Sequence, residues 1–162
     1  MDDGSRLPVV GMTGSKGITV VKEWFDQLLE NDFNNIRSPG SYHSQIGVPL
    51  SVLTLNSSHT LGIFEAGIST SGEMISLERI IRPTIGVFTN IGQAHDEGFG
   101  NIVQKIIEKL KLFTHDDNMV FPGDDKMLKT EIIRFKQKNK NNKTDLKLFY
   151  WGKKEDNDLK IF

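Results

Sequence analysis

The sequence predicts an α/β fold in which a mostly parallel sheet is flanked by helices. Short β-type runs alternate with longer segments of helical periodicity, which is the pattern of βαβ units rather than of a sandwich or a helical bundle. The first of these runs leads through a glycine-spaced turn directly into a helical pattern. Hydrophobic residues make up 37% and charged residues 25% of the 162 residues, which is ordinary for one globular domain with its own core.

The elements follow from this alternation, with ends placed to within about 2 to 4 residues. The strands are the short apolar runs rich in β-branched and aromatic residues, and we expect them near Pro8–Met12, Asn35–Ser38, Leu61–Glu65, Thr84–Asn90, Met119–Pro122 and Leu146–Trp151. The helices are the longer segments between them, and we expect them near Ile18–Glu30, Val48–Leu55, Glu73–Ile81, Ile102–Phe113 and Lys126–Lys138. The final KKEDNDLKIF begins what looks like one more strand.

Composition excludes several classes of function. The formal net charge of -1 gives no global attraction for nucleic acid or an anionic membrane, and the Lys- and Asn-rich stretch Lys136–Lys143 lacks the interleaved aromatic residues that stack on bases. The chain has no cysteine, which excludes disulfides, thiolate metal sites and cysteine nucleophiles. No apolar run approaches the roughly 18 residues that cross a bilayer, and the start lacks a signal-peptide pattern. We therefore expect a cytoplasmic protein.

The turn after the first strand has the chemistry of a phosphate-binding loop. Glycines at positions 11, 14 and 17 let backbone amides point into one concavity, and the helix that follows adds the partial positive charge of its N-terminus. In the pattern G-x-x-x-x-G-K-[ST] the lysine reaches the phosphates and the hydroxyl holds Mg²⁺. Thr19 fits the hydroxyl position, but Ile18 stands where the lysine is expected. The alternative is a plain glycine turn.

Five segments in order resemble the central domain of the Mur ligases: GMTGSKGITVVKEW, SPGSYHSQIGVPLSV, IFEAGISTSGEM, IRPTIGVFTNIGQAHDEGF and EKLKLF. The resemblance runs from about Val9 to about Trp151 and implies a phosphate-loop α/β domain, present here in part. It is strongest to members that add D-alanyl-D-alanine to a UDP-muramoyl tripeptide, including forms fused to an alanine racemase. These compounds, and such a fusion, are the partners that the resemblance implies.

The resemblance implies that the loop binds ATP. The family pattern is G-x-T-G-[ST]-N-G-K-T, from which this chain departs at Lys16, in place of Asn, and at Ile18, in place of Lys. Losing a charge-assisted contact to phosphate typically removes about 1.5 to 3 kcal/mol. The nucleotide contacts implied for this chain are Gly11, Thr13, Gly14, Ser15, Lys16, Gly17, Ile18, Thr19 and Asn90.

The resemblance also implies two Mg²⁺ positions. Glu65 ends the apolar run LGIFEAG, and side chains at the carboxyl edge of a parallel sheet face the ligand crevice. By resemblance Glu65 shares one Mg²⁺ with Thr19, and His95, in a match to the motif N-I-x-x-A-H, binds a second. The alternatives are a solvent-facing acid at Glu65 and an ordinary polar loop residue at His95.

Lys109 is the third candidate catalytic and metal-binding residue, with Glu65 and His95. At about 100° per residue it lies about 20° outside an apolar arc of about 140°, so we expect it to be the lysine of its helix nearest the buried face. The family carries a carbamylated lysine at this spacing, and carbamylation would turn the ammonium into an anion able to bind metal. The alternative is a snorkelling lysine. The arc is formed by Ile102, Val103, Ile106, Ile107, Leu110 and Phe113.

The segment 38–48 resembles the substrate-side loop of the family. Ser41, Ser44 and Gln45 are its candidate polar contacts, while His43 stands where the most similar family members carry Asn. The alternative is a loop that serves only as the entry to the helix in IGVPLSVL.

The family reaction is ATP-dependent amide formation, in which a substrate carboxylate takes the γ phosphate and an amine displaces phosphate from the acyl phosphate. By resemblance the full enzyme also has an N-terminal domain for the uridine nucleotide and a C-terminal domain that closes over ATP. We therefore interpret residues 1–162 as a single domain that is a fragment, inactive alone. The alternative is a degenerate binding module that has lost ATP. A folylpolyglutamate synthetase is disfavoured by the AHDE and SQIGVP segments.

Overall fold

The computed structural model describes residues 6–92, 98–139 and 146–161. His95 therefore lies outside the described residues. All seven strands form one parallel sheet in the order β2-β3-β1-β4-β5-β6-β7, which confirms the predicted α/β class and the additional strand near the end. The strands are β1 (Val9–Thr13), β2 (Asn35–Arg37), β3 (Leu61–Glu65), β4 (Ile85–Phe88), β5 (Asn118–Pro122), β6 (Lys147–Gly152) and β7 (Leu159–Lys160).

Helices connect the first six strands as the alternation predicts, and a short turn connects β6 to β7. The predicted helix 102–113 ends as an α-helix at Leu110 and continues as a 3-10 turn, Lys111–Phe113. No described helix is long and apolar enough to cross a membrane. The helices are α1 (Ile18–Leu29), α2 (Gly47–Val52), α3 (Glu73–Ile81), α4 (Ile102–Leu110) and α5 (Lys126–Asn139).

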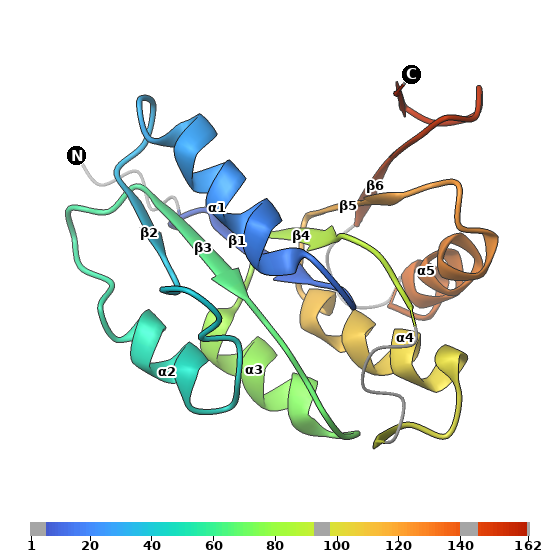
Figure 1. Cartoon of the computed structure of the whole chain (residues 1–162), viewed down its shortest axis with the longest axis horizontal. Helices are drawn as coiled ribbons and strands as arrows, with labels where there is room; N and C mark the ends of the chain where they lie inside the picture. Colours follow the sequence, from blue (N-terminus) through green and yellow to red (C-terminus); the bar gives the residue numbers. More distant parts are fainter. Residues whose placement is uncertain (1–5, 93–97, 140–145, 162) are drawn as a thin grey trace.

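The helices divide between the two faces of the sheet (Figure 1). On one face α1 packs over Val10, Met12 and Val87 of the central strands. The other face carries the larger core, to which α2, α3, α4 and α5 contribute Val48, Met74, Leu77, Ile106, Leu110, Leu128 and Ile132. Because both faces of the central strands are covered, these strands are almost continuously apolar.

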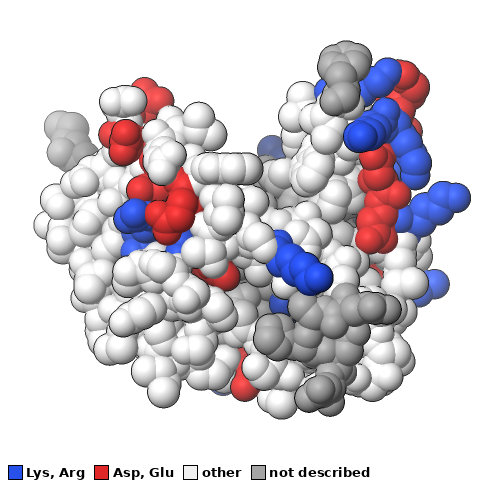
Figure 2. Space-filling model, viewed as in Figure 1, with Lys and Arg blue, Asp and Glu red and all other residues white. Residues whose placement is uncertain are grey.

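The α1 face is covered only in part. Val120 of β5 pairs with Val87 of the covered strand β4 but is only half-buried, and Phe149 of β6, which pairs with Val120, is exposed. Figure 2 shows this side of the molecule hollowed between α1 and the C-terminal strands, with charged side chains gathered over the C-terminal elements.

The order of the strands positions the functional site. From β1 the chain passes to β2 and β3 on one side, and after β3 it crosses to β4 on the other side of β1. The carboxyl ends of β1, β3 and β4 therefore border the point at which the topology reverses, where open α/β sheets bind ligands.

The buried face of α4 differs from the predicted apolar arc. Ile107, at one edge of that arc, is 43% exposed. At about 100° per residue the centre of the buried face lies about 90° from the centre of the arc, close to Lys109. The buried residues of α4 are Lys105, Ile106, Glu108, Lys109 and Leu110.

Polar contacts explain this rotation. The Lys105 ammonium donates to the Gly92 carbonyl at 2.7 Å, and the Gly72 amide donates to the Glu108 carboxylate at 2.7 Å. Loops that follow β4 and β3 thus cover the charged side of α4. Lys109 lies at the centre of this buried face, as expected of the lysine nearest to it, and Lys105 is buried beside it.

Candidate nucleotide site

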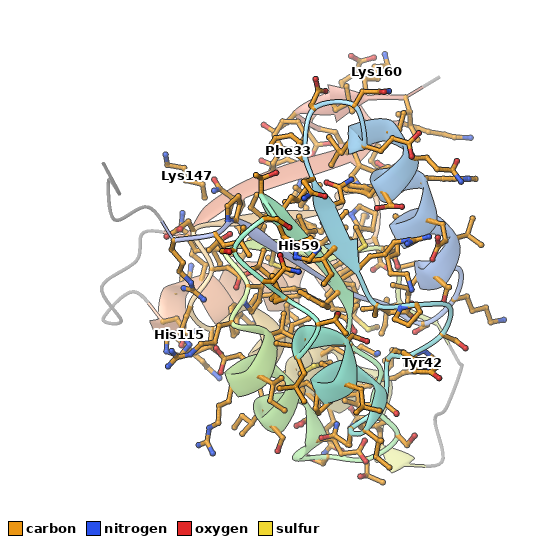
Figure 3. All side chains as sticks on the ribbon, turned by 90° about the vertical axis from the view of Figure 1, so that its left-hand side faces the viewer. Phe33, Tyr42, His59, His115, Lys147 and Lys160 are labelled. Atoms are coloured by element: carbon orange, nitrogen blue, oxygen red, sulfur yellow. The ribbon has the colours of Figure 1, made fainter. Side chains whose placement is uncertain are left out.

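A cavity of about 430 Å³ lies at the carboxyl edge of the central strands. Loop residues 14–19 line one side, and residues 43–46 of the segment after β2 line another. Glu65 and Lys109 reach the same cavity. In Figure 3, Tyr42 of that segment lies across the molecule from Lys147, which begins β6 and marks the amino edge of the sheet.

The glycine loop is shaped for an anion. β1 ends at Thr13 and α1 begins at Ile18, directly after Gly17, whose φ of 70° favours glycine. Gly17 gives no side-chain cap to the first turn of α1, and residues 17–19 at this end of the helix line the cavity. A Cβ on Gly14 would lie 2.1 Å from the Thr89 hydroxyl, so the loop can approach β4 this closely only with glycine.

The side chain of Asn90 fixes the glycine loop through hydrogen bonds to its backbone. Its Oδ1 accepts from the amides of Ser15, at 3.2 Å, and Lys16, at 3.0 Å, and its Nδ2 donates to the Lys16 carbonyl at 2.7 Å. Ser15 is also bonded to Gly92 through its hydroxyl. The predicted strand 84–90 ends at Phe88, which leaves Asn90 free to turn towards the loop.

Glu65 is the buried charge at the centre of the site. Glu65 is the last residue of β3 and is 3% exposed. Oε2 accepts from the Thr19 hydroxyl at 2.9 Å and lies 3.8 Å from the Lys22 ammonium. Oε1 lies 3.3 Å from Nδ1 of His43. The structure thus brings Thr19 and Glu65 into contact, 46 residues apart in the sequence.

Lys22 is a site residue that the sequence analysis missed. It is fully buried, and its ammonium donates to the Gly40 carbonyl and lies 3.6 Å from Glu23. Burial lowers the pKa of Lys22, while the carboxylates of Glu65 and Glu23 act to raise it. The signal was present, because Lys22 follows Ile18 by four residues and so falls on the apolar face of α1.

Lys109 reaches the site from the opposite face of the sheet. Its ammonium donates to the Thr13 hydroxyl at 3.3 Å, and that hydroxyl donates to the Ala66 carbonyl at 2.8 Å. Burial, together with the charge of Lys105, lowers the pKa of Lys109 to about 8, while Glu65 acts to raise it. A substantial fraction of Lys109 is therefore a neutral, nucleophilic amine near pH 8.

The remaining predicted residues have different surroundings. Gly11 lies inside β1, where a Cβ would be 2.8 Å from Pro83, so close packing explains this glycine. Ser44 accepts the Gly47 amide at 3.1 Å at the entry to α2, and Gln45 donates to the Glu73 carbonyl at 3.3 Å. Ser41 is exposed and does not line the cavity.

The oxygen donors fit a hard divalent cation. Thr19 and Glu65 offer a hydroxyl and a carboxylate side by side, and Mg²⁺ is commonly held by one or two carboxylates together with substrate phosphates and water. Among the described residues no group of three His, Cys, Asp or Glu side chains is arranged to hold a metal without such phosphates.

A parallel sheet whose first strand runs through a glycine loop into a helix, with a hydroxyl and a buried carboxylate beside it, defines the phosphate-loop class of α/β domains. Comparison with known families is more specific, because the Mur ligase middle domain matches residues 12–160. The chain therefore belongs to the Mur ligase family. This confirms the family and the fold that the five sequence segments predicted.

Several relatives share the name of one ligase. Over 123 residues the chain is 30% identical to a UDP-N-acetylmuramoyl-tripeptide--D-alanyl-D-alanine ligase of Bacillus subtilis, covering 74% of this chain and 27% of the relative. Over 118 residues it is 34% identical to the ligase of the same name from Treponema pallidum, covering 72% and 26%. The MurF ligase of Thermotoga maritima in complex with ADP superposes with a TM-score of 0.78 at 28% identity, covering 94% of this chain and 34% of that one. The chain thus spans about a quarter of the length of these curated relatives.

Proposed function

We propose that this chain is the nucleotide-binding part of an ATP-dependent ligase that joins D-alanyl-D-alanine to a UDP-muramoyl tripeptide. The contact between Thr19 and Glu65 beside the glycine loop carries this proposal, because it pairs the two side chains that Mg-ATP would need. The names of the relatives and the ADP in the Thermotoga maritima structure support the choice of nucleotide and substrates.

In the proposed mechanism the chain contributes positioning and charge. The loop amides and the N-terminus of α1 stabilise the negative charge of the phosphates, while Asn90 keeps the loop in place. Thr19 and Glu65 would hold Mg²⁺, which neutralises charge on the phosphates. The γ phosphate passes to the substrate carboxylate, and the amine then displaces phosphate from this acyl phosphate to form the amide.

The second metal position remains a prediction. It would use His95 and Lys109, with Lys109 carbamylated. The lowered pKa of Lys109 supports this, since carbamylation of lysine requires the neutral amine. We assign Ser41, Ser44 and Gln45 to the peptide side of the site and treat the chain as one domain, residues 1–162, of a longer ligase. Fusion of that ligase to an alanine racemase belongs to the same proposal.

A second candidate function is a non-catalytic module that has kept the fold and lost the nucleotide. Ile18 favours it, because this residue is 9% exposed and packs with Val10, Met12 and Ile63 in the core beneath α1. An apolar side chain thus occupies the position of the expected phosphate-binding lysine.

Titration calorimetry separates the two candidates. Mg-ADP is titrated into this chain and into a longer protein in which the domains found in the relatives are restored. We expect binding in both, and we expect Thr19→Val to weaken it by about tenfold or more through loss of the hydroxyl. Absence of binding in both proteins would overturn the ligase proposal and leave the non-catalytic module.

A further inference from the structure

His43 places an unpartnered ring nitrogen beside the carboxylate of Glu65. Its Nδ1 is buried and has no hydrogen-bond partner within the described part of the chain, although it lies 3.3 Å from Oε1 of Glu65. The backbone holds the residue in place, because the His43 carbonyl accepts the Gly67 amide at 2.8 Å. A Cβ on Gly67 would lie 2.3 Å from Cδ2 of His43, so this glycine makes room for the imidazole.

The spacing of these donors is that of metal ligands. Adjacent ligands of an octahedral ion with bonds of about 2.1 Å lie about 3.0 Å apart. The distance from His43 Nδ1 to Glu65 Oε1 is 3.3 Å, and that from Thr19 Oγ1 to Glu65 Oε2 is 2.9 Å. Imidazole, carboxylate and hydroxyl therefore converge at distances that one divalent cation can bridge after small adjustments.

The charges around the carboxylate limit the affinity for a metal alone. Lys22 lies 3.8 Å from Oε2, and Lys109 interacts with Glu65 through its charge. Lys22 and an uncarbamylated Lys109 are ammonium groups that oppose a metal cation at Glu65, so we expect weak binding that strengthens when nucleotide phosphates are present. The nature of the ligands decides the preference, since Mg²⁺ favours oxygen donors while Mn²⁺, Co²⁺ and Zn²⁺ accept imidazole readily.

We propose that His43 is a metal ligand beside Thr19 and Glu65, and that it shifts the preference of this site from Mg²⁺ towards Mn²⁺ and other imidazole-binding cations. This inference rests on the proposed function for the position of the metal. It concerns a residue at which the most similar family members carry Asn. His43→Asn is therefore the matched variant.

The test uses Mn²⁺ alone, with no nucleotide. Electron spin echo spectroscopy of bound Mn²⁺ detects a directly coordinated imidazole through its nitrogen nucleus, and competition with Mg²⁺ gives the ratio of the two affinities. We expect the nitrogen signal in the unmodified chain and its loss in His43→Asn. The preference for Mn²⁺ over Mg²⁺ should fall by about tenfold or more. Glu65→Gln should weaken the binding of both ions.

Three outcomes would overturn the inference: no Mn²⁺ binding at millimolar concentration, no nitrogen signal in the unmodified chain, or an unchanged ion preference in His43→Asn. Thermal melting checks that the variant folds, and His43→Gln serves if His43→Asn does not. Because no nucleotide is present, the result is independent of the Mg-ADP titration. A chain that binds ADP without the nitrogen signal would retain the proposed function and lose only this ligand.

Discussion

Asp116 should make the stability of this protein depend on pH in an unusual direction. The residue is 1% exposed, and neither carboxylate oxygen has a hydrogen-bond partner among the described residues. Burial, with the negative charges of Glu78 and Asp117, raises the pKa of Asp116 to about 8, while Arg6 acts to lower it. Nδ1 of His115, the residue that precedes Asp116, lies 2.8 Å from Oε1 of Glu78.

The sign and the size of the effect follow from proton linkage. An aspartate in the unfolded chain has a pKa of about 3.9, so between about pH 4 and pH 8 the folded protein holds one proton more than the unfolded chain. The free energy of unfolding then falls as pH rises, by at most about 1.4 kcal/mol per pH unit. From pH 5 to pH 7 the loss is at most about 3 kcal/mol, or about 6 to 12 °C in Tm. Lys109, whose pKa is lowered to about 8, contributes mainly above this range.

The assay is denaturant unfolding at several pH values for the unmodified chain and for Asp116→Asn. An amide of the same shape cannot ionise, so the variant should lose the downward slope between pH 5 and pH 7 that the unmodified chain shows. Asp117→Asn changes an exposed neighbour and should keep the slope. Equal slopes in the unmodified chain and in Asp116→Asn would refute the conclusion that Asp116 is protonated in the folded protein.

Three further substitutions test the loop and the core. Ile18→Lys should tighten Mg-ADP binding by about 10- to 150-fold in calorimetry, because it restores a charge-assisted contact to phosphate, and should lower Tm by a few degrees. The control Ile18→Gln should lower Tm alone, and equal affinities of the two variants would mean that position 18 does not reach the phosphates. Asn90→Ala removes three hydrogen bonds to the loop and should cost about 1 to 3 kcal/mol in denaturant unfolding, an expectation that an unchanged midpoint would contradict. Gly86→Ala places a Cβ 2.4 Å from Phe113 and should lower the free energy of unfolding by about 1 to 3 kcal/mol in denaturant titration. An unchanged midpoint would show that the ring moves aside without loss of stability.

Much of the fold was predictable because its signals are local. The strand Leu61–Glu65 and the helix Glu73–Ile81 have the predicted bounds, since an apolar run in the first and helical periodicity in the second specify them directly. Thr89 and Asn90 were predicted as strand and lie in a loop. Periodicity cannot show that the Asn90 side chain bonds to the backbone of a loop 75 residues earlier, which turns the chain out of the sheet.

The buried face of α4 shows why other features were not predictable. Apolar periodicity assumes that charged side chains face water. In α4 the carbonyl of Gly92 and the amide of Gly72 supply partners to Lys105 and Glu108, so these charged groups are buried while Ile107 is exposed. Those partners come from other loops, and their positions depend on the tertiary structure.

The residues around Glu65 sharpen what the loss of the loop lysine means. The chain keeps Thr19, Glu65 and Lys109 of the family pattern and departs from it at positions 16, 18 and 43, which all line the same cavity. These departures change which groups can contact phosphate or metal. Position 18 lacks a positive charge, Lys16 carries one two residues earlier, and the imidazole of His43 lies beside the retained carboxylate of Glu65. Random loss of the site would not be expected to pack His43 against Gly67 with Nδ1 of the imidazole 3.3 Å from Oε1 of Glu65. Under the proposed function, altered metal and phosphate chemistry on a retained scaffold accounts for this arrangement better than simple loss of function.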